Sequence, residues 1–94
     1  MAETVDGLSV EYTDDGVITV KELDKIVLTK GAWATLIYRY QDLNRKTDEY
    51  GPDKYTIRRY QKRNGEYQQK SKFNISSADQ ARKIITALEQ WIDE

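Results

Sequence analysis

An Asn64-Gly65 pair divides the second half of this 94-residue chain into two stretches rich in β-forming residues. Asn-Gly readily adopts the positive φ angles of a two-residue turn, and between such stretches it is the strongest short-range signal of a β-hairpin. The predicted arms run from Tyr55 to Lys62 and from Tyr67 to Ile75. We therefore expect an antiparallel pair of strands in this part of the chain.

The first half of the chain alternates stretches of β-branched and aromatic residues with turns that contain glycine. Such a pattern predicts further strands, because β-branched and aromatic side chains fit a pleated surface and glycine permits tight turns. The expected elements are hairpin arms at 8–13 and 17–23 around Asp14-Asp15-Gly16, a short strand at 26–29, a long strand at 33–43 and a polar loop at 44–53.

Strand alternation assigns the side chains of the 54–75 hairpin to two faces. Ile57, Phe73 and Ile75 are expected to face the interior, under the helix, and Tyr67 shares the face of Phe73 and Ile75. The side chains expected on the opposite, solvent-facing side are Arg58, Tyr60, Lys62, Lys70 and Lys72.

The long strand at 33–43 allows two orientations. In the first, Ile37 faces the interior, and the charged Arg39 on the same face is an exception to the apolar pattern. In the second, Leu36 faces the interior together with Tyr38 and Tyr40. Alternation alone leaves both open.

The C-terminal segment predicts an amphipathic helix. Ser77 fits the N-cap of a capping box and Gln80 its third helical position. The apolar residues that follow at helical spacing are Ala81, Ile84, Ile85, Leu88 and Ile92, with Trp91 beside them. The apolar side of this helix is wider than is needed to cover one face of a small sheet. Surplus apolar surface of this kind marks an interface. We therefore expect a homodimer, whose interface residues are Ile85, Leu88, Trp91 and Ile92.

Together these elements predict an α+β fold, in which a curved antiparallel sheet of four to six strands is followed by one C-terminal amphipathic helix. The length is that of one domain. We expect a flexible N-terminus at residues 1–7 and a single sheet-plus-helix domain at residues 8–94.

Cysteine and histidine are both absent from the chain. Disulfides and thiolate metal sites are therefore excluded, and the commonest general base and metal ligand is missing. Acidic pairs such as Asp14-Asp15 stand in segments typical of turns. We expect no enzyme activity, no cofactor and no metal. No apolar run is long enough to span a membrane, and no signal-peptide pattern is present, so an intracellular, cytoplasmic or nucleoid-associated location is expected.

Charge is distributed unevenly along the chain. Residues 1–24 carry seven acids and one lysine, whereas residues 54–75 carry seven basic residues and one acid. A locally basic surface indicates a polyanionic partner. The expected solvent-facing side of the 54–75 hairpin also carries an aromatic ring, that of Tyr60, on which an unpaired base can stack. The acidic N-terminal arm is a candidate competitor for this surface, unless Val10 and Tyr12 join the sheet.

The hairpin also carries a family resemblance. Its sequence has Ile57-Arg58-Arg59-Tyr60, a Gly65-Glu66 turn, Lys70-Ser71-Lys72 and Phe73-Asn74-Ile75 before a Ser-capped helix. This order resembles the transcriptional coactivator positive cofactor four family, whose architecture is shared by Whirly proteins. Arg59 stands where that family has an acid, and the family's glycine before the last strand is missing.

The resemblance implies a dimeric single-stranded-DNA-binding module that acts in transcription regulation. It matches Arg58 and Tyr60 to the family's strand residues, and Lys70 and Lys72 to its basic pair. We therefore expect a module that binds single-stranded nucleic acid. The alternative is a protein-interaction or structural dimer of the same fold without strong nucleic-acid binding. The sequence leaves open whether the nucleic acid is DNA or RNA.

Overall fold

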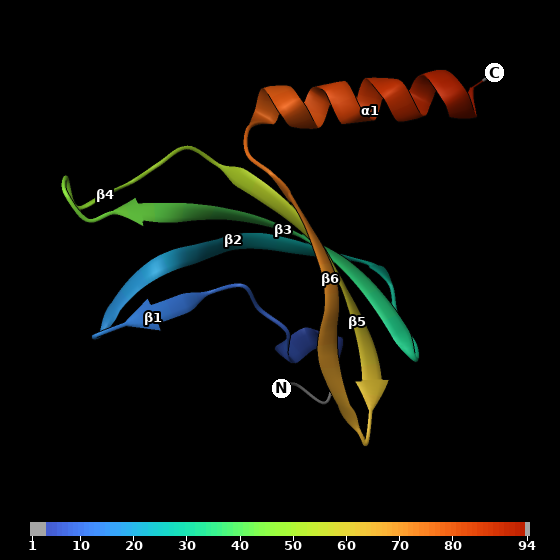
Figure 1. The fold of residues 1–94 in the computed structure, drawn as a ribbon, viewed down its shortest axis with the longest axis horizontal. Helices are drawn as coiled ribbons and strands as arrows, with labels where there is room; N and C mark the ends of the chain where they lie inside the picture. Colours follow the sequence, from blue (N-terminus) through green and yellow to red (C-terminus); the bar gives the residue numbers. More distant parts are fainter. Residues whose placement is uncertain (1–3, 94) are drawn as a thin grey trace.

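A computed structural model describes residues 4–93, which form one curved antiparallel sheet and a C-terminal helix (Figure 1). The strand order is β1-β2-β3-β5-β6, and the short β4 pairs only with the end of β3. The predicted α+β fold is confirmed. The strands are β1 (Tyr12–Asp14), β2 (Val17–Thr29), β3 (Trp33–Asn44), β4 (Glu49–Tyr50), β5 (Lys54–Arg63) and β6 (Glu66–Ile75).

Both predicted hairpin turns are present. Asp15 and Gly16 have φ angles of 51° and 78°, and Asn64 and Gly65 have φ angles of 53° and 83°. Two successive positive φ angles define the turn whose twist matches the flanking strands. β2 runs without interruption through residues 17–29, where the sequence predicts two separate strands.

The sheet has two faces of different character. Ala34, Leu36 and Tyr38 of β3 are fully buried, and the register places them opposite Tyr60, Arg58 and Thr56 of β5. We call this side the core face. Of the two orientations predicted for β3, the one with Leu36, Tyr38 and Tyr40 together is therefore correct. The opposite side, called the helix face, carries an apolar row that crosses the strands. Its members are Ile26, Ile37, Ile57 and Phe73.

An N-terminal strap, residues 5–10, covers the core face. Lys25 on β2 donates hydrogen bonds from its Nζ to the carbonyl oxygens of Val5, Asp6 and Leu8, at 3.0, 2.9 and 2.6 Å. Leu8 and Val10 are buried and belong to the same cluster as the side chains of the core face. The three donors of one ammonium thus hold the strap on the sheet.

The strap changes the expected picture of the N-terminus. Residues 1–3 of the expected flexible segment lie outside the described residues, and Val5–Gly7 form a 3-10 turn, η1. Further along, Glu22 accepts hydrogen bonds from Ser9 Oγ and Val10 N. The flexibility expected for residues 1–7 stays a prediction, while the contacts of 5–10 make the strap part of the fold.

Helix α1 (Ala78–Ile92) begins at the predicted N-cap. Ser77 Oγ accepts a hydrogen bond from Gln80 N at 3.1 Å. The Gln80 side chain accepts from Ser76 N rather than from Ser77 N, so the reciprocal bond of the box falls one residue earlier than predicted. The helix extends from the end of β6 away from the sheet, and none of its residues is buried (Figure 1).

The molecule is more open than a compact domain of this length. Its radius of gyration is 15.1 Å, against about 12 Å expected for a compact chain of this size. Its accessible surface is 6814 Å², against about 5,600 Å² expected for a folded monomer of this mass. The excess surface reflects a helix that stands off the sheet. Within residues 4–93, no helix has the length and apolar character needed to cross a membrane.

Candidate nucleic-acid interface

The hairpin of β5 and β6 contains a β-bulge that the sequence pattern did not reveal. Arg59 pairs with Ser71 and Tyr60 pairs with Gln69, so Lys70 is an extra residue on β6. A bulge of this kind re-aims the side chains on either side of it. Tyr67 consequently lies on the core face with Tyr60, whereas alternation had placed it with Phe73 and Ile75.

The hairpin therefore carries cations on both of its faces rather than on one. Arg58, Lys62 and Lys72 lie on the core-face side, as the register with Leu36, Tyr67 and Arg58 shows. Arg59 and Arg63 lie on the helix-face side. The predicted grouping of Arg58, Lys62 and Lys72 is confirmed. Arg59 lies on the side of Ile57, as alternation within the strand predicts, and Arg63 lies there too. Lys70, predicted on the face of Arg58, is instead the extra residue of the bulge.

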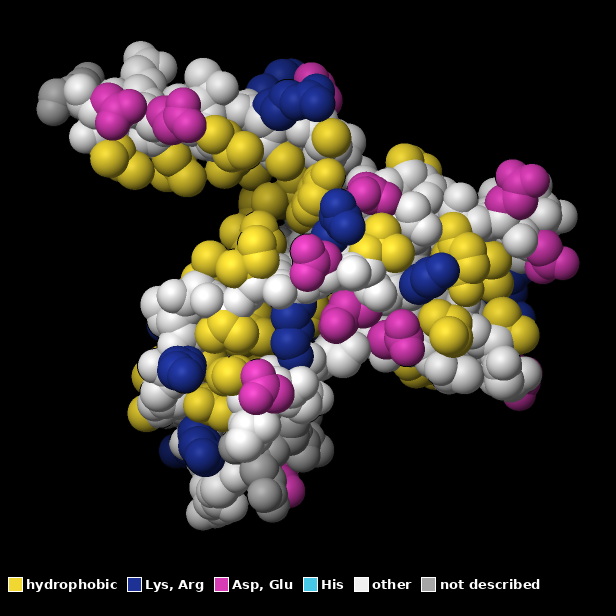
Figure 2. Space-filling view, turned by 180° about the vertical axis from the view of Figure 1, so that it is seen from behind, with side chains coloured by type: hydrophobic (Ala, Val, Ile, Leu, Met, Phe, Trp, Pro, Cys, Tyr) yellow, Lys and Arg dark blue, Asp and Glu magenta, His cyan; other side chains and the backbone are white. Residues whose placement is uncertain are grey.

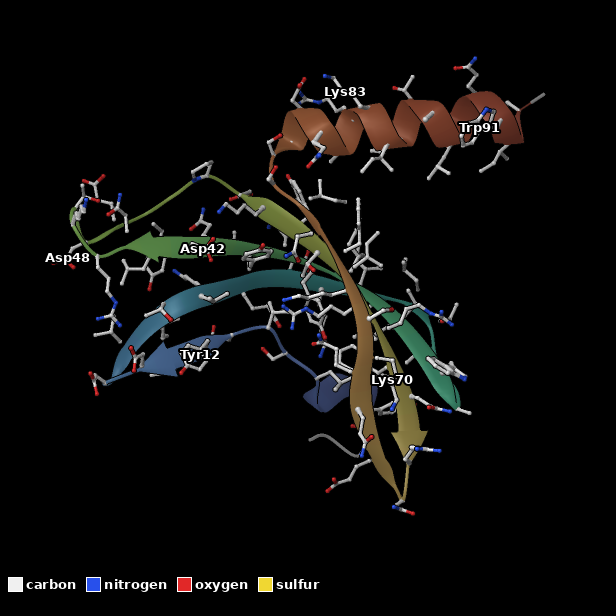
Figure 3. All side chains as sticks on the ribbon, in the orientation of Figure 1. Tyr12, Asp42, Asp48, Lys70, Lys83 and Trp91 are labelled. Carbon is white, nitrogen blue, oxygen red and sulfur yellow. The ribbon has the colours of Figure 1, made fainter. Side chains whose placement is uncertain are left out.

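Arg58 is the most enclosed of these cations. Its Nη1 donates a hydrogen bond of 2.9 Å to Gln69 Oε1, and its Nε is buried without a hydrogen-bond partner. Beside it, the Lys62 ammonium lies 5.5 Å from the centre of the Tyr67 ring. Lys70 and Lys72 are exposed on the edge strand. Figure 3 labels Lys70 on the outer strand of the hairpin.

The positive charge of the hairpin has few acidic partners in the part of the chain that the structure describes. Lys54 donates a hydrogen bond of 2.8 Å to Asp42, and this bond raises the pKa of Lys54. Among residues 4–93, no carboxylate lies within 4 Å of the other six cations of the hairpin. Charge without an internal partner is available to an external anion.

Tyr60 is not the exposed stacking residue that the sequence predicts. The residue lies on the expected side of β5, away from the helix, but its side chain is only 3% exposed. Its hydroxyl shares a hydrogen bond of 3.0 Å with Tyr38 in the core. The physical reason is the strap, because Leu8 and Val10 turn this side of the sheet into the interior. A base cannot stack on Tyr60 while the strap is in place.

The side chains predicted to form a dimer interface are all exposed. Ile85, Leu88, Trp91 and Ile92 are between 49% and 76% exposed. Ile85 and Leu88 line a groove between α1 and the sheet. The groove has a volume of about 560 Å³. Figure 2 shows an almost continuous band of hydrophobic side chains along the helix and onto the sheet. Its aliphatic lining includes Ile26, Ile37, Ile57, Ile84, Ile85 and Leu88, and charged side chains such as Asp24 and Arg82 also border it.

The acidic arm packs on the sheet, and Leu8 and Val10 share a buried cluster with Tyr60 and Tyr67 of the hairpin. Asp14, at the end of β1, pairs with Arg45 at 3.0 Å in the turn after β3. Tyr12 pairs with Val20 in the sheet, and Val10 is buried. The arrangement favours the alternative in which the arm belongs to the fold. Among the described residues, no three acidic side chains are grouped closely enough to hold a metal ion.

Sequence reasoning missed one exposed aromatic residue beside the hairpin. Trp33, at the start of β3, is 43% exposed, and the Arg59 guanidinium carbon lies 4.8 Å from the centre of its ring. The sequence feature that could have revealed it is the position of Trp33 at the very start of the strand predicted at 33–43. The structure pairs Trp33 there with the polar Gln61 of β5.

Comparison with protein-family models, with curated proteins and with solved structures found no match to this chain.

Proposed function

We propose that this protein is a homodimeric, non-enzymatic module that binds single-stranded nucleic acid through the β5–β6 hairpin. The observation that carries the proposal is a set of six hairpin cations that have no carboxylate partner among residues 4–93. Lysine and arginine neutralise phosphates and release counterions, which supplies affinity without sequence readout. The resemblance to the positive cofactor four family favours the same function and stays a prediction.

The shape of the hairpin favours single strands over a duplex. β6 is an edge strand. The cations of the β5–β6 hairpin lie on both sides of this two-stranded ribbon. A flexible single strand can follow such a ribbon, whereas a duplex presents phosphates at fixed positions. The exposed amides of Gln68 and Asn74 add hydrogen-bonding groups along the same strand.

Replacing Lys70 and Lys72 with glutamine is expected to weaken binding of oligothymidine and oligouridine. Each lost phosphate contact should lower the slope of log affinity against log salt by about one unit. Lys83→Gln is the matched control, because Lys83 is an exposed lysine on α1 (Figure 3). Fluorescence anisotropy across a salt series measures both quantities. Equal slopes for the double variant and the control would contradict a role for the hairpin.

The homodimer is supported by the exposed apolar surface. The accessible surface exceeds that of a compact monomer by about 1,200 Å², and a stable interface buries about 800 Å² on each partner. The chain carries both halves of such an interface, namely a helix with one apolar side and an apolar groove. A twofold axis can therefore place the helix of each copy against the groove of the other. A helix of 15 residues without packing is marginal in water, so a partner also explains its stability.

Sedimentation should show a species of twice the 11.0 kDa chain mass at micromolar concentration. Leu88→Asp is expected to yield the 11.0 kDa species, because a buried charge without a partner opposes association. Thr86→Asp introduces the same charge at an exposed helix position outside the groove lining and serves as the control. A wild-type chain that sediments as a monomer would overturn the homodimer.

The same apolar surface favours a second candidate function, a protein-interaction or structural dimer without strong nucleic-acid binding. The two functions differ in the salt series described above. A wild-type dimer that binds neither oligothymidine nor oligouridine at low salt would establish the second and exclude the first.

A further inference from the structure

The helix face of the sheet carries a second surface beyond its apolar row. Toward the β5–β6 turn, β3 and β5 pair Thr35 with Arg59 and Trp33 with Gln61, and β5 and β6 continue this surface. The surface is aromatic, cationic and polar rather than aliphatic. Its members are Trp33, Thr35, Arg59, Gln61, Gln68 and Ser71.

Trp33 and Arg59 form the centre of this surface. Nearly half of the Trp33 side chain is exposed, although the Arg59 guanidinium lies over its ring at 4.8 Å. Arg59 is also exposed, and it has no ion-pair partner among the carboxylates of the described residues. Arginine stacked on an aromatic ring holds both groups in place and leaves the guanidinium edge free for an anion.

The neighbours of the pair are polar. Trp33 lies among amide and hydroxyl groups and beside Arg59, rather than among aliphatic side chains. Amides and hydroxyls can hydrogen-bond the edges of an unstacked base, and an indole ring can stack on its face.

We propose that the Trp33–Arg59 pair binds one unpaired nucleotide, with the base on the indole ring and a flanking phosphate on the guanidinium. The inference rests on the proposed function and assigns its stacking site to Trp33 instead of the buried Tyr60. The nucleotide belongs to a single strand that continues along the cations of β6. DNA and RNA both supply the base and the phosphate that this contact uses.

The test uses the intrinsic fluorescence of Trp33. In a Trp91→Phe variant, Trp33 is the sole tryptophan. Because Trp91 belongs to the expected dimer interface, sedimentation and oligonucleotide affinity of this variant are first matched to those of the wild type. Oligothymidine and oligouridine, titrated separately at low salt, should quench its emission. The two titrations show whether DNA, RNA or both are bound at this position. Quenching by either oligonucleotide supports the proposal.

Substitutions test the energetics of the pair. Trp33→Leu should weaken oligonucleotide binding about 5- to 150-fold without changing the salt slope, since loss of stacking releases no counterion. Trp33→Phe should restore part of the affinity, and Arg59→Gln should lower the slope by about one unit. Tyr12→Leu removes another exposed aromatic residue, on β1, and should bind like the wild type (Figure 3).

Failure of this inference is distinguishable from failure of the proposed function. If the wild type binds oligonucleotides with a steep salt slope, but Trp33→Leu binds equally and Trp33 emission does not change, the stacking site is wrong and the basic hairpin stands. If the wild type binds neither oligonucleotide, both proposals fall. Circular dichroism of each variant confirms that the sheet is intact.

Discussion

Tyr60→Ala is expected to lower the free energy of unfolding by about 3–5 kcal/mol, the range for removal of a buried aromatic side chain. Tyr60 is almost fully buried and lies in one cluster with Leu36, Tyr38 and Tyr67. Its removal leaves a cavity in a small core, because the surrounding strands cannot close around it. Urea denaturation followed by circular dichroism measures the loss.

Tyr60→Phe separates the ring from its hydroxyl. The ring would remain in the cluster, but the buried Tyr38 hydroxyl would lose its partner, at a cost of about 1–3 kcal/mol. Burial, followed by the bond to Tyr60, raises the pKa of the Tyr38 phenol far above its ordinary value, so Tyr38 stays neutral and depends on this hydrogen bond. A Tyr60→Ala variant as stable as the wild type would contradict the buried position. Tyr12→Ala, at an exposed position, should change stability by at most about 0.5 kcal/mol.

The elements that the sequence predicted correctly are those specified by neighbouring residues. The Asn64-Gly65 turn and the Ser77 N-cap depend on backbone angles and hydrogen bonds within a few positions, and both are present. The separation of Arg58 and Tyr60 from Ile57 is also correct, because alternation within a strand is local.

The errors concern what covers the sheet and where its register shifts. Alternation divides β5 into two faces but does not say which one is buried. That choice depends on the strap, whose anchor Lys25 belongs to a different strand and reads in the sequence as an exposed charge. The bulge at Lys70 similarly follows from pairing with β5 and has no distinctive residue of its own. The burial of Tyr60, which was predicted to be the stacking residue, follows from the strap. The position of Tyr67 on the core face follows from the bulge.

The strap itself provides the second large effect. Removing residues 1–10 is expected to lower the free energy of unfolding by about 3–6 kcal/mol, because the buried side chains of Leu8 and Val10 contribute about 1.5–3 kcal/mol each. A domain of this kind is stable by only about 5–15 kcal/mol, so the truncated chain should melt far below the full chain. Differential scanning calorimetry of both chains measures the difference.

A point variant tests whether burial, rather than loss of acidic charge, explains this effect. Leu8→Ala leaves every charge in place and should still cost about 2–5 kcal/mol through the cavity it creates. Ser9→Ala changes the neighbouring exposed side chain, whose hydroxyl donates to Glu22 and accepts from Glu11 N. Because water can replace both exposed hydrogen bonds, this variant should cost only about 1 kcal/mol. If Leu8→Ala were as stable as Ser9→Ala, the strap would not be part of the core. The side of the sheet that carries Tyr60 would then be open to ligands, and Tyr60 would again be a candidate for base stacking.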